Sequence, residues 1–202
     1  LHLSIRRQRQ MCIRDSVRVA GQVSEVGDWL ENLDKFGGSL LAEEKVEFRR
    51  ELSQLSARNP AGEFAAWPLV QTIQQKGVCS EVIAPAPGIL DKSISIEIAK
   101  TIAEGLNVTG VMAVELFEDS TGNLLINELA MRPHNSGHFS IEGSVTSQFE
   151  QHLRAVANLP LGSTAMKAEV AVMVNLLGVD DSNTFVEHYP AAVSYTHLTL
   201  PT

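Results

Sequence analysis

Two strand-like runs joined by a short polar turn constrain this chain more than any other feature. The runs are residues 110–117 (GVMAVELF) and residues 124–130 (LLINELA). Side chains alternate along a strand, so each run predicts one apolar row interrupted by one carboxylate, Glu115 or Glu128. The expected apolar neighbours in these rows are Val111, Ala113 and Phe117 in the first, and Leu124, Ile126 and Ala130 in the second.

The turn residues set the expected register of this hairpin. A tight turn over residues 120–123, centred between Thr121 and Gly122, places Glu115 directly opposite Glu128. Opposed like charges destabilise a strand pair, and a buried carboxylate without a partner is costly, so the pair predicts a bound cation. A one-residue shift instead puts the acids on opposite faces. The alternative is that both acids are rim residues on an exposed edge.

The nature of the expected cation follows from the ligands. Glu115, Glu128 and the amide oxygen of Asn127 are hard oxygen ligands, which suit Mg²⁺ carrying substrate phosphates better than zinc. His134 and His138 have the i, i+4 spacing of zinc ligands on a helix, but Pro133 and Gly137 argue against a continuous helix there. The alternative for both histidines is a ring satisfied by local backbone, which we favour for His138.

The segment that follows the second run resembles a known family. Residues 126–143 (INELAMRPHNSGHFSIEG) and 146–162 (TSQFEQHLRAVANLPLG) closely resemble the signature of the N5-carboxyaminoimidazole ribonucleotide synthases, ATP-grasp ligases of purine biosynthesis. The resemblance extends roughly over residues 17–192. It implies that ATP phosphorylates bicarbonate to carboxyphosphate, whose carboxyl group is then taken up by the amine of 5-aminoimidazole ribonucleotide.

The resemblance also implies roles for individual residues. Glu115 and Glu128 would hold Mg²⁺ between the ATP phosphates with help from Asn127, which with Glu128 is also assigned to ATP binding. The catalytic assignment is Arg132, which would steady bicarbonate or its phosphorylated product through its bidentate guanidinium. His134 and Asn135 would line the same pocket.

A second set of implied roles lies upstream. The segment Glu43, Glu44, Lys45 and Val46 would form the hinge whose backbone pairs with adenine, and Glu51 would bind the ribose hydroxyls. From the residues alone, the alternative is that Glu43, Glu44 and Glu51 merely solvate a strand face.

The fold class expected is α+β, a partial ATP-grasp domain in which helices pack on an antiparallel sheet, followed by the start of a small β-rich domain. Strands are predicted within residues 39–59, after a turn at residues 59–62, within residues 77–87 and over residues 168–177. One helix is predicted from an apolar stripe formed by Ile94, Ile98, Ile102 and Leu106 with Ala99 and Ala103 between them. Another is predicted after the capping box at residues 147–150, with Phe149, Leu153 and Val156 on its packed face.

The domain boundaries expected are 17–160 for the ATP-grasp part and 161–192 for the start of the C-terminal domain. Residues 1–16 and 193–202 resemble translated adapter sequence and are expected to be non-native flanks, although residues 1–16 can also be read as a basic tail for an acidic partner. No glycine-rich phosphate loop is recognised, since Gly37-Gly38 lacks the following lysine. The chain alone is therefore expected to have negligible ligase activity.

Composition limits the partners. With 202 residues, 44% hydrophobic content and a net charge of −8, the chain can bury a core and lacks the basic surface typical of nucleic-acid binding. No run reaches the roughly 18 apolar residues of a membrane span. Two cysteines, Cys12 and Cys79, fit a reducing, cytoplasmic location, and Cys79 is expected to be buried and inert.

The partners expected are ATP, bicarbonate and 5-aminoimidazole ribonucleotide, and full-length relatives are expected to be homodimers. Two other readings of the function stay open. One is a neighbouring ATP-grasp enzyme, such as a biotin carboxylase or a formate-dependent glycinamide ribonucleotide transformylase. The other is a non-catalytic module that binds Mg²⁺ and nucleotide.

Overall fold

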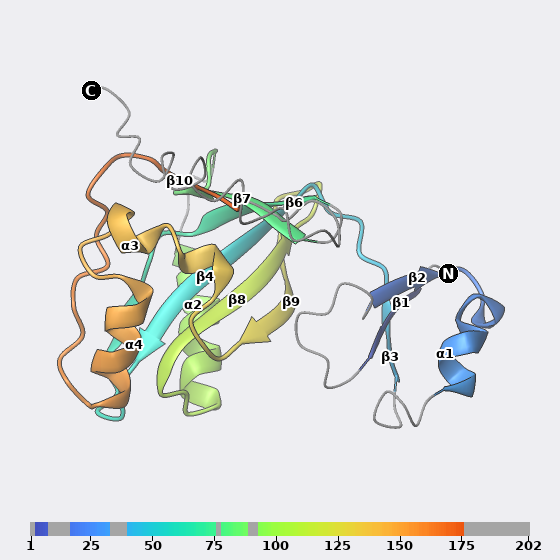
Figure 1. Ribbon diagram of the computed structural model, residues 1–202, viewed down its shortest axis with the longest axis horizontal. Coiled ribbons are helices and arrows are strands. Elements are labelled where there is room, and N and C mark those ends of the chain that lie inside the picture. The colour runs from blue at the N-terminus through green and yellow to red at the C-terminus, as the bar shows by residue number, and fades with distance from the viewer. Residues whose placement is uncertain (1–2, 8–16, 33–39, 76–77, 89–92, 176–202) are drawn as a thin grey trace, which may run out of the picture.

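The computed structural model describes residues 3–7, 17–32, 40–75, 78–88 and 93–175. Among these residues there are two antiparallel sheets (Figure 1). A three-stranded sheet has the order β2-β1-β3, and a seven-stranded sheet has the order β10-β7-β6-β4-β8-β9 with β5 paired to β4. The small sheet contains β1 (Leu3–Arg7), β2 (Val17–Ala20) and β3 (Leu40–Glu44). The large one contains β4 (Arg50–Arg58), β5 (Phe64–Ala66), β6 (Val70–Gln75), β7 (Val78–Ala84), β8 (Gly110–Glu118), β9 (Leu124–Ala130) and β10 (Ala171–Val174).

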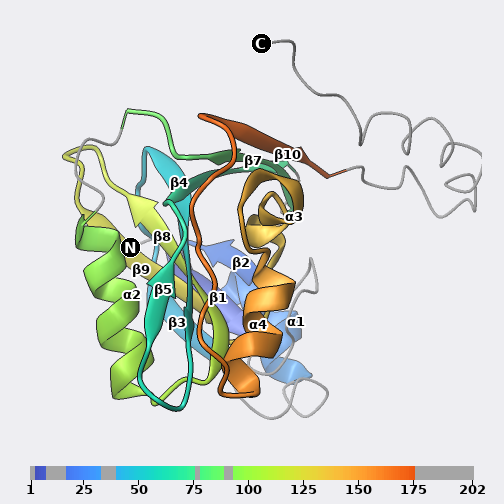
Figure 2. The same ribbon diagram turned by 90° about the vertical axis from the view of Figure 1, so that its left-hand side faces the viewer.

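Helices cover both faces of the large sheet, as Figure 2 shows with α2 on one side and α4 on the other. The helices are η1 (Val23–Val26), α1 (Gly27–Glu31), α2 (Ser93–Gly105), η3 (Asn135–Gly137), α3 (Ser140–Gly143) and α4 (Gln148–Val156). Because strand residues alternate, each face has its own core. Leu52, Met112 and Leu116 pack with α2, whereas Leu55, Trp67 and Ala113 belong to the core on the face that carries Phe139. None of the described helices is long and apolar enough to cross a bilayer.

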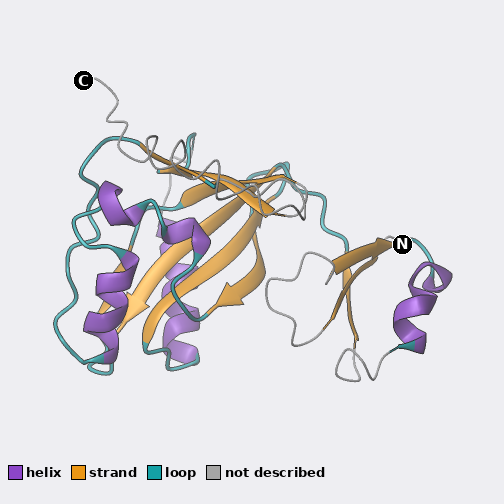
Figure 3. Ribbon diagram, viewed as in Figure 1, coloured by secondary structure: helices purple, strands orange, loops and turns teal. Residues whose placement is uncertain are grey.

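The small sheet joins the large one through residues 45–49, a connection without regular structure (Figure 3). Phe48 on this connection stacks on Phe117 of β8 with 4.3 Å between ring centroids, and the N–H of Arg49 donates to the carbonyl of Glu118 at 2.7 Å. These contacts fix the end of β3 beside one end of β4 and β8.

The predicted helix at residues 94–106 is present, and the middle of its stripe is buried as expected, because Ala99 and Ala103 lie in the core with Ile98 and Ile102 packed against it. The residues of α2 that face the sheet are Ser95, Ala99 and Ala103, whereas Ile94 and Leu106 are each 55% exposed. Small side chains allow the helix to approach the strands closely, so the larger isoleucines lie at its flank.

In α4 the predicted apolar face is not the buried one. The predicted cap is confirmed, because Ser147 Oγ accepts from the N–H of Glu150 at 3.2 Å. However, Phe149, Leu153 and Val156 are 42%, 66% and 48% exposed. The buried positions of α4 are instead Gln148, Gln151 and Ala155, and the two glutamines bind backbone groups of neighbouring loops.

The C-terminal strand joins the main sheet. β10 pairs with β7 in antiparallel register, with Ala171 opposite Ala84, so within the described part this segment extends the large sheet. The boundary at residue 161 stays a prediction, since most of the proposed domain and the flank 193–202 lie outside the described residues. Of the proposed flank 1–16, only β1 is described, paired with β2 and β3. Gly37 and Gly38 also lie outside the described residues.

Gly110 gives a first testable prediction. Its φ is +110°, and a Cβ there would lie 2.8 Å from the ring of His152 on α4, which accepts a hydrogen bond from the N–H of Val111 at 3.1 Å. We expect Gly110→Ala to lower the free energy of unfolding by about 2 kcal/mol, because backbone strain and a clash add together. Urea unfolding measures this change. Gly122→Ala is the control, since Gly122 has φ +90° in open space, and equal losses for both variants would contradict the clash.

Candidate functional site

The predicted pairing of the two acids is confirmed, although the turn that produces it is different. Their burial is not as expected, because Glu128 is exposed on the edge strand β9 and Glu115 is half-buried. Glu115 on β8 lies directly opposite Glu128 on β9. The connection is a five-residue loop in which Asp119 Oδ1 accepts from the N–H groups of Thr121 and Asn123. By itself, this loop would pair Glu115 with Asn127, one residue away from the predicted partner Glu128.

Asn127 corrects that shift. Leu116 pairs with Ile126 and Glu115 with Glu128, so Asn127 is the extra residue of a β-bulge. The bulge also reverses the alternation of side chains along β9. The expectation that Leu124 and Ile126 share a face with Glu128 is therefore wrong, and Leu125, which pairs with Phe117, lies on that face instead.

The polar row continues onto the next strand. Ser53 of β4 lies opposite Glu115 on the other side of β8, and Glu51, two residues earlier on the same face, lies opposite Phe117. Burial raises the pKa of Glu51, a hydrogen bond with Gln74 opposes this rise, and the charge of Glu115 adds to it. The shift shows that Glu51 and Glu115 belong to one negatively charged patch.

The loop after β9 lies over this patch. His134 Nε2 lies 3.1 Å from Glu115 Oε1, and His134 Nδ1 lies 2.9 Å from Ser136 Oγ. Ser136 Oγ in turn lies 2.8 Å from Ser53 Oγ. A chain of hydrogen-bonding groups thus runs from β4 through the loop to Glu115. Residues 53 and 136 were missed by the sequence analysis, although the polar alternation Glu51, Ser53 within a buried strand is a readable signal.

The remaining predicted residues have definite positions around this patch. Arg132 is the second residue after β9, and its Nη1 donates to the carbonyl of Pro133 at 3.1 Å. Asn135 begins η3. His138 is largely exposed, but its ring stacks on Phe149 with 5.7 Å between centroids. This partial burial of the ring, and then the charge of His134, lower the pKa of His138.

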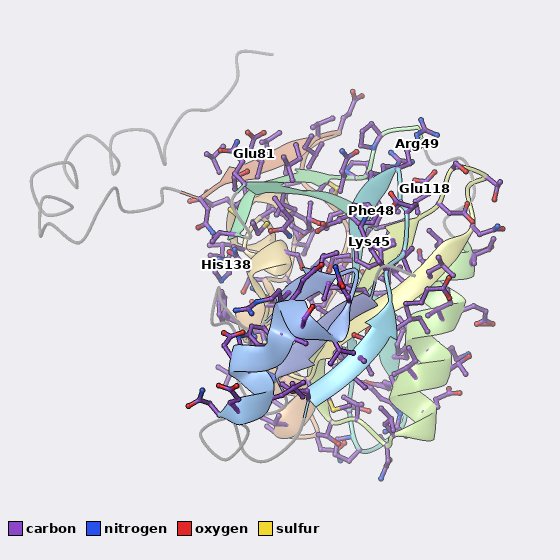
Figure 4. The ribbon with its side chains drawn as sticks, turned by 90° about the vertical axis from the view of Figure 1, so that its right-hand side faces the viewer. Lys45, Phe48, Arg49, Glu81, Glu118 and His138 are labelled. Atoms are coloured by element: carbon purple, nitrogen blue, oxygen red, sulfur yellow. The ribbon has the colours of Figure 1, made fainter. Side chains whose placement is uncertain are left out.

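The expected adenine hinge lies on a different element. Glu43 and Glu44 end β3, and Lys45 and Val46 begin the connection to β4. Figure 4 shows Lys45, Phe48 and Arg49 along this connection with Glu118 close to Arg49, while His138 lies apart from them. The stacked pair Phe48 and Phe117 joins the connection to the strand that carries Glu115. The sequence analysis did not single out Phe48.

The arrangement suits a magnesium ion better than zinc. Two opposed carboxylates beside an amide side chain give hard oxygen ligands, and Mg²⁺ usually takes one or two carboxylates and completes its shell with water and substrate phosphates. Within the described residues, no group of three or more His, Cys, Asp and Glu is arranged to hold a metal. The two histidine rings have different partners, because His134 Nε2 lies against Glu115 and the His138 ring stacks on Phe149.

The negative charge of the patch affects the pKa of the nearby Cys79 thiol. Burial, together with the charges of Glu115 and Glu51, raises the pKa of its thiol to about 11. At pH 8 its thiolate fraction is then about a hundredfold below that of an ordinary cysteine, so we expect labelling by a disulfide reagent to be slower by about that factor. The measurement uses a Cys12→Ser background and follows the labelling rate from pH 7 to 10. A rate equal to that of a free cysteine would contradict the burial.

Known proteins match this chain over most of its length. A family model for the ATP-grasp domain matches residues 15–149. The N5-carboxyaminoimidazole ribonucleotide synthase of Mycobacterium bovis is 52% identical over 164 residues, which are 80% of this chain and 38% of that protein. The chain therefore spans less than half the length of this curated relative.

Solved structures agree. The N5-carboxyaminoimidazole ribonucleotide synthetase of Thermus thermophilus is 39% identical with a TM-score of 0.76, covering 94% of this chain and 50% of that chain. The Aspergillus clavatus N5-carboxyaminoimidazole synthase, in complex with ADP and 5-aminoimidazole ribonucleotide, is 28% identical with a TM-score of 0.80, covering 95% and 50%.

Proposed function

The chain belongs to the ATP-grasp family, and we propose that its large sheet carries the metal- and phosphate-binding half of an N5-carboxyaminoimidazole ribonucleotide synthase. The observation that carries the proposal is the direct opposition of Glu115 and Glu128 beneath the Arg132–His138 loop. Two facing carboxylates repel each other, and a divalent ion bound between them would offset that repulsion.

We assign the roles by position. Glu115, Glu128 and Asn127 would hold Mg²⁺, which when bound neutralises charge on the ATP phosphates. Arg132 is the second residue after β9 and its guanidinium can bind an anion through two hydrogen bonds, so bicarbonate or its phosphorylated form is its proposed ligand. His134 and Asn135 would bound the same pocket and exclude water from it.

The nucleotide would extend towards the connection between the sheets. Glu51 lies on the same face of the sheet as the two acids and is opposite Phe117, one of the two stacked phenylalanines. This position suits contact with ribose hydroxyls. Glu43, Glu44, Lys45 and Val46 end β3 and begin the connection, where the backbone leaves regular structure and can pair with a base edge. The proposed partners are ATP, bicarbonate and 5-aminoimidazole ribonucleotide, and we propose a cytoplasmic homodimer for the longer enzyme.

A chimaera tests the proposed reaction. Residues 17–175 would replace the matching segment of the Thermus thermophilus relative, which shares 39% identity. We expect ADP release that needs both bicarbonate and 5-aminoimidazole ribonucleotide. Release that needs formate and glycinamide ribonucleotide, or biotin, would instead support the other ATP-grasp enzymes. A folded chimaera that binds Mg²⁺-ADP but turns over none of these substrates would support the non-catalytic module.

A further inference from the structure

Gln148 is a fully buried polar side chain at the first turn of α4. Its Oε1 accepts from the N–H of His134 at 2.8 Å, and its Nε2 donates to the carbonyl of the same residue at 2.8 Å. One amide side chain therefore satisfies both backbone groups of one loop residue, as a neighbouring strand would. This pairing fixes the orientation of the peptide units on both sides of His134.

Further contacts close the loop around this pairing. The N–H of Gln148 donates to Ser140 Oγ at 2.9 Å, and that hydroxyl donates to the carbonyl of Gly137 at 2.5 Å. A Cβ at Gly137 would clash with Gln148 Oε1. The glycine thus leaves the room that the glutamine amide occupies.

The orientation of the His134 ring determines which of its two nitrogens faces Glu115. The N–H of Ser136 donates to His134 Nδ1 at 3.4 Å, so a neutral ring carries its proton on Nε2. That nitrogen lies 3.1 Å from Glu115 Oε1. The hydrogen bond to Glu115 therefore depends on a backbone position that Gln148 sets from another element.

We infer that Gln148 is a positioning residue, which holds the His134 loop so that the ring orients the Glu115 carboxylate for its metal. The inference rests on the proposed function for the role of Glu115. Partners that orient a metal ligand typically change metal affinity by about 10- to 100-fold when they are removed. Gln148 acts through His134, and we expect an effect near the lower end of that range.

Gln151 provides a matched control on the same helix. It is also fully buried, its Nε2 donates to the carbonyl of Gly162 at 2.8 Å, and its Oε1 accepts from the N–H of Gly162 at 2.7 Å. The two glutamines make the same kind of pairing, but only Gln148 pairs with the loop that contacts Glu115.

The experiment compares Gln148→Met and Gln151→Met in the 202-residue chain. The ¹⁵N shifts of the His134 ring at pH 8, assigned with His134→Gln, report which nitrogen carries the proton. We expect the Nε2–H form in wild type and Gln151→Met, and a mixture of both forms in Gln148→Met. Calorimetry with Mg²⁺-ADP should show affinity lowered about tenfold in Gln148→Met and changed less than about twofold in Gln151→Met.

Each outcome decides between positioning and general stability. An unchanged His134 ring in Gln148→Met, or the same change in Gln151→Met, would overturn the inference. If wild type does not bind Mg²⁺-ADP, the proposed function fails, while the ring shifts still decide the role of Gln148. If Gln148→Met does not fold, hydrogen exchange of the His134 amide in wild type replaces it, and exchange at the rate of an open loop would refute the pairing.

Discussion

Glu128→Gln is expected to weaken binding of Mg²⁺-ADP by at least about a hundredfold. The substitution removes one of two opposed carboxylates, and an amide is a much weaker ligand for a hard cation that depends on few protein oxygens. A hundredfold loss corresponds to about 2.7 kcal/mol of binding free energy. Calorimetry with and without EDTA separates the metal-dependent part from contacts to the nucleotide alone.

The stability of the same variant distinguishes loss of a ligand from loss of the fold. Removing one of two facing like charges relieves repulsion, so we expect the melting temperature without metal to stay the same or rise slightly. Glu104→Gln is the control, because Glu104 is an exposed acid on α2, which covers the other face of the sheet. Affinity in Glu128→Gln that stays within about twofold of wild type would remove the metal role.

Glu118→Gln is expected to lower the free energy of unfolding by about 3–5 kcal/mol. Glu118 forms an ion pair with Arg50, and the side chains are 8% and 12% exposed. Arg50 also donates to the carbonyl of Pro87 at 2.6 Å, so it cannot turn to solvent without losing that contact. The variant therefore leaves a charged group buried without its counter-charge, and urea unfolding measures the cost.

Two comparisons test this explanation. Asp28→Asn breaks the pair with Arg18, whose side chains are 61% and 36% exposed, and exposed pairs contribute only about 0–1 kcal/mol. The double variant Arg50→Met, Glu118→Leu removes both charges and should recover much of the lost stability. Equal losses for Glu118→Gln and Asp28→Asn would show that burial does not determine the cost.

The sequence predicts the hairpin well, but for an incomplete reason. Alternation and a polar turn correctly place Glu115 opposite Glu128. The tight turn assumed is absent, and the bulge at Asn127 compensates for the longer loop. A bulge is set by the local hydrogen-bond pattern of both strands, and periodicity within one strand does not reveal it.

The helix faces show where periodicity fails. Apolar stripes correctly locate both helices. In α2 the buried Ala99 and Ala103 belong to the predicted stripe, whereas in α4 the stripe points to the wrong side. In α2 the sheet selects small side chains for close approach. In α4 the buried side chains include Gln148 and Gln151, because adjacent loops present backbone groups that need hydrogen-bond partners. In both helices, which side chains are buried depends on neighbours that are distant in sequence.

The candidate site also contains residues that the sequence predicts and residues that it does not. Residues 110–138 contain both acids, Asn127 and the loop, so a local motif predicts them together. Ser53 and Gln148 come from other elements, and their link to the site depends on three-dimensional contacts. The roles of individual site residues stay predictions.

The bulge at Asn127 has a consequence for association between molecules. β9 is the last strand on its side of the described sheet, and the outer side of such an edge strand can be a template for another chain. The extra residue interrupts the regular spacing of backbone groups midway along the strand. The irregularity that aligns the acids thus also discourages polymerisation through the open edge, and one residue serves both purposes.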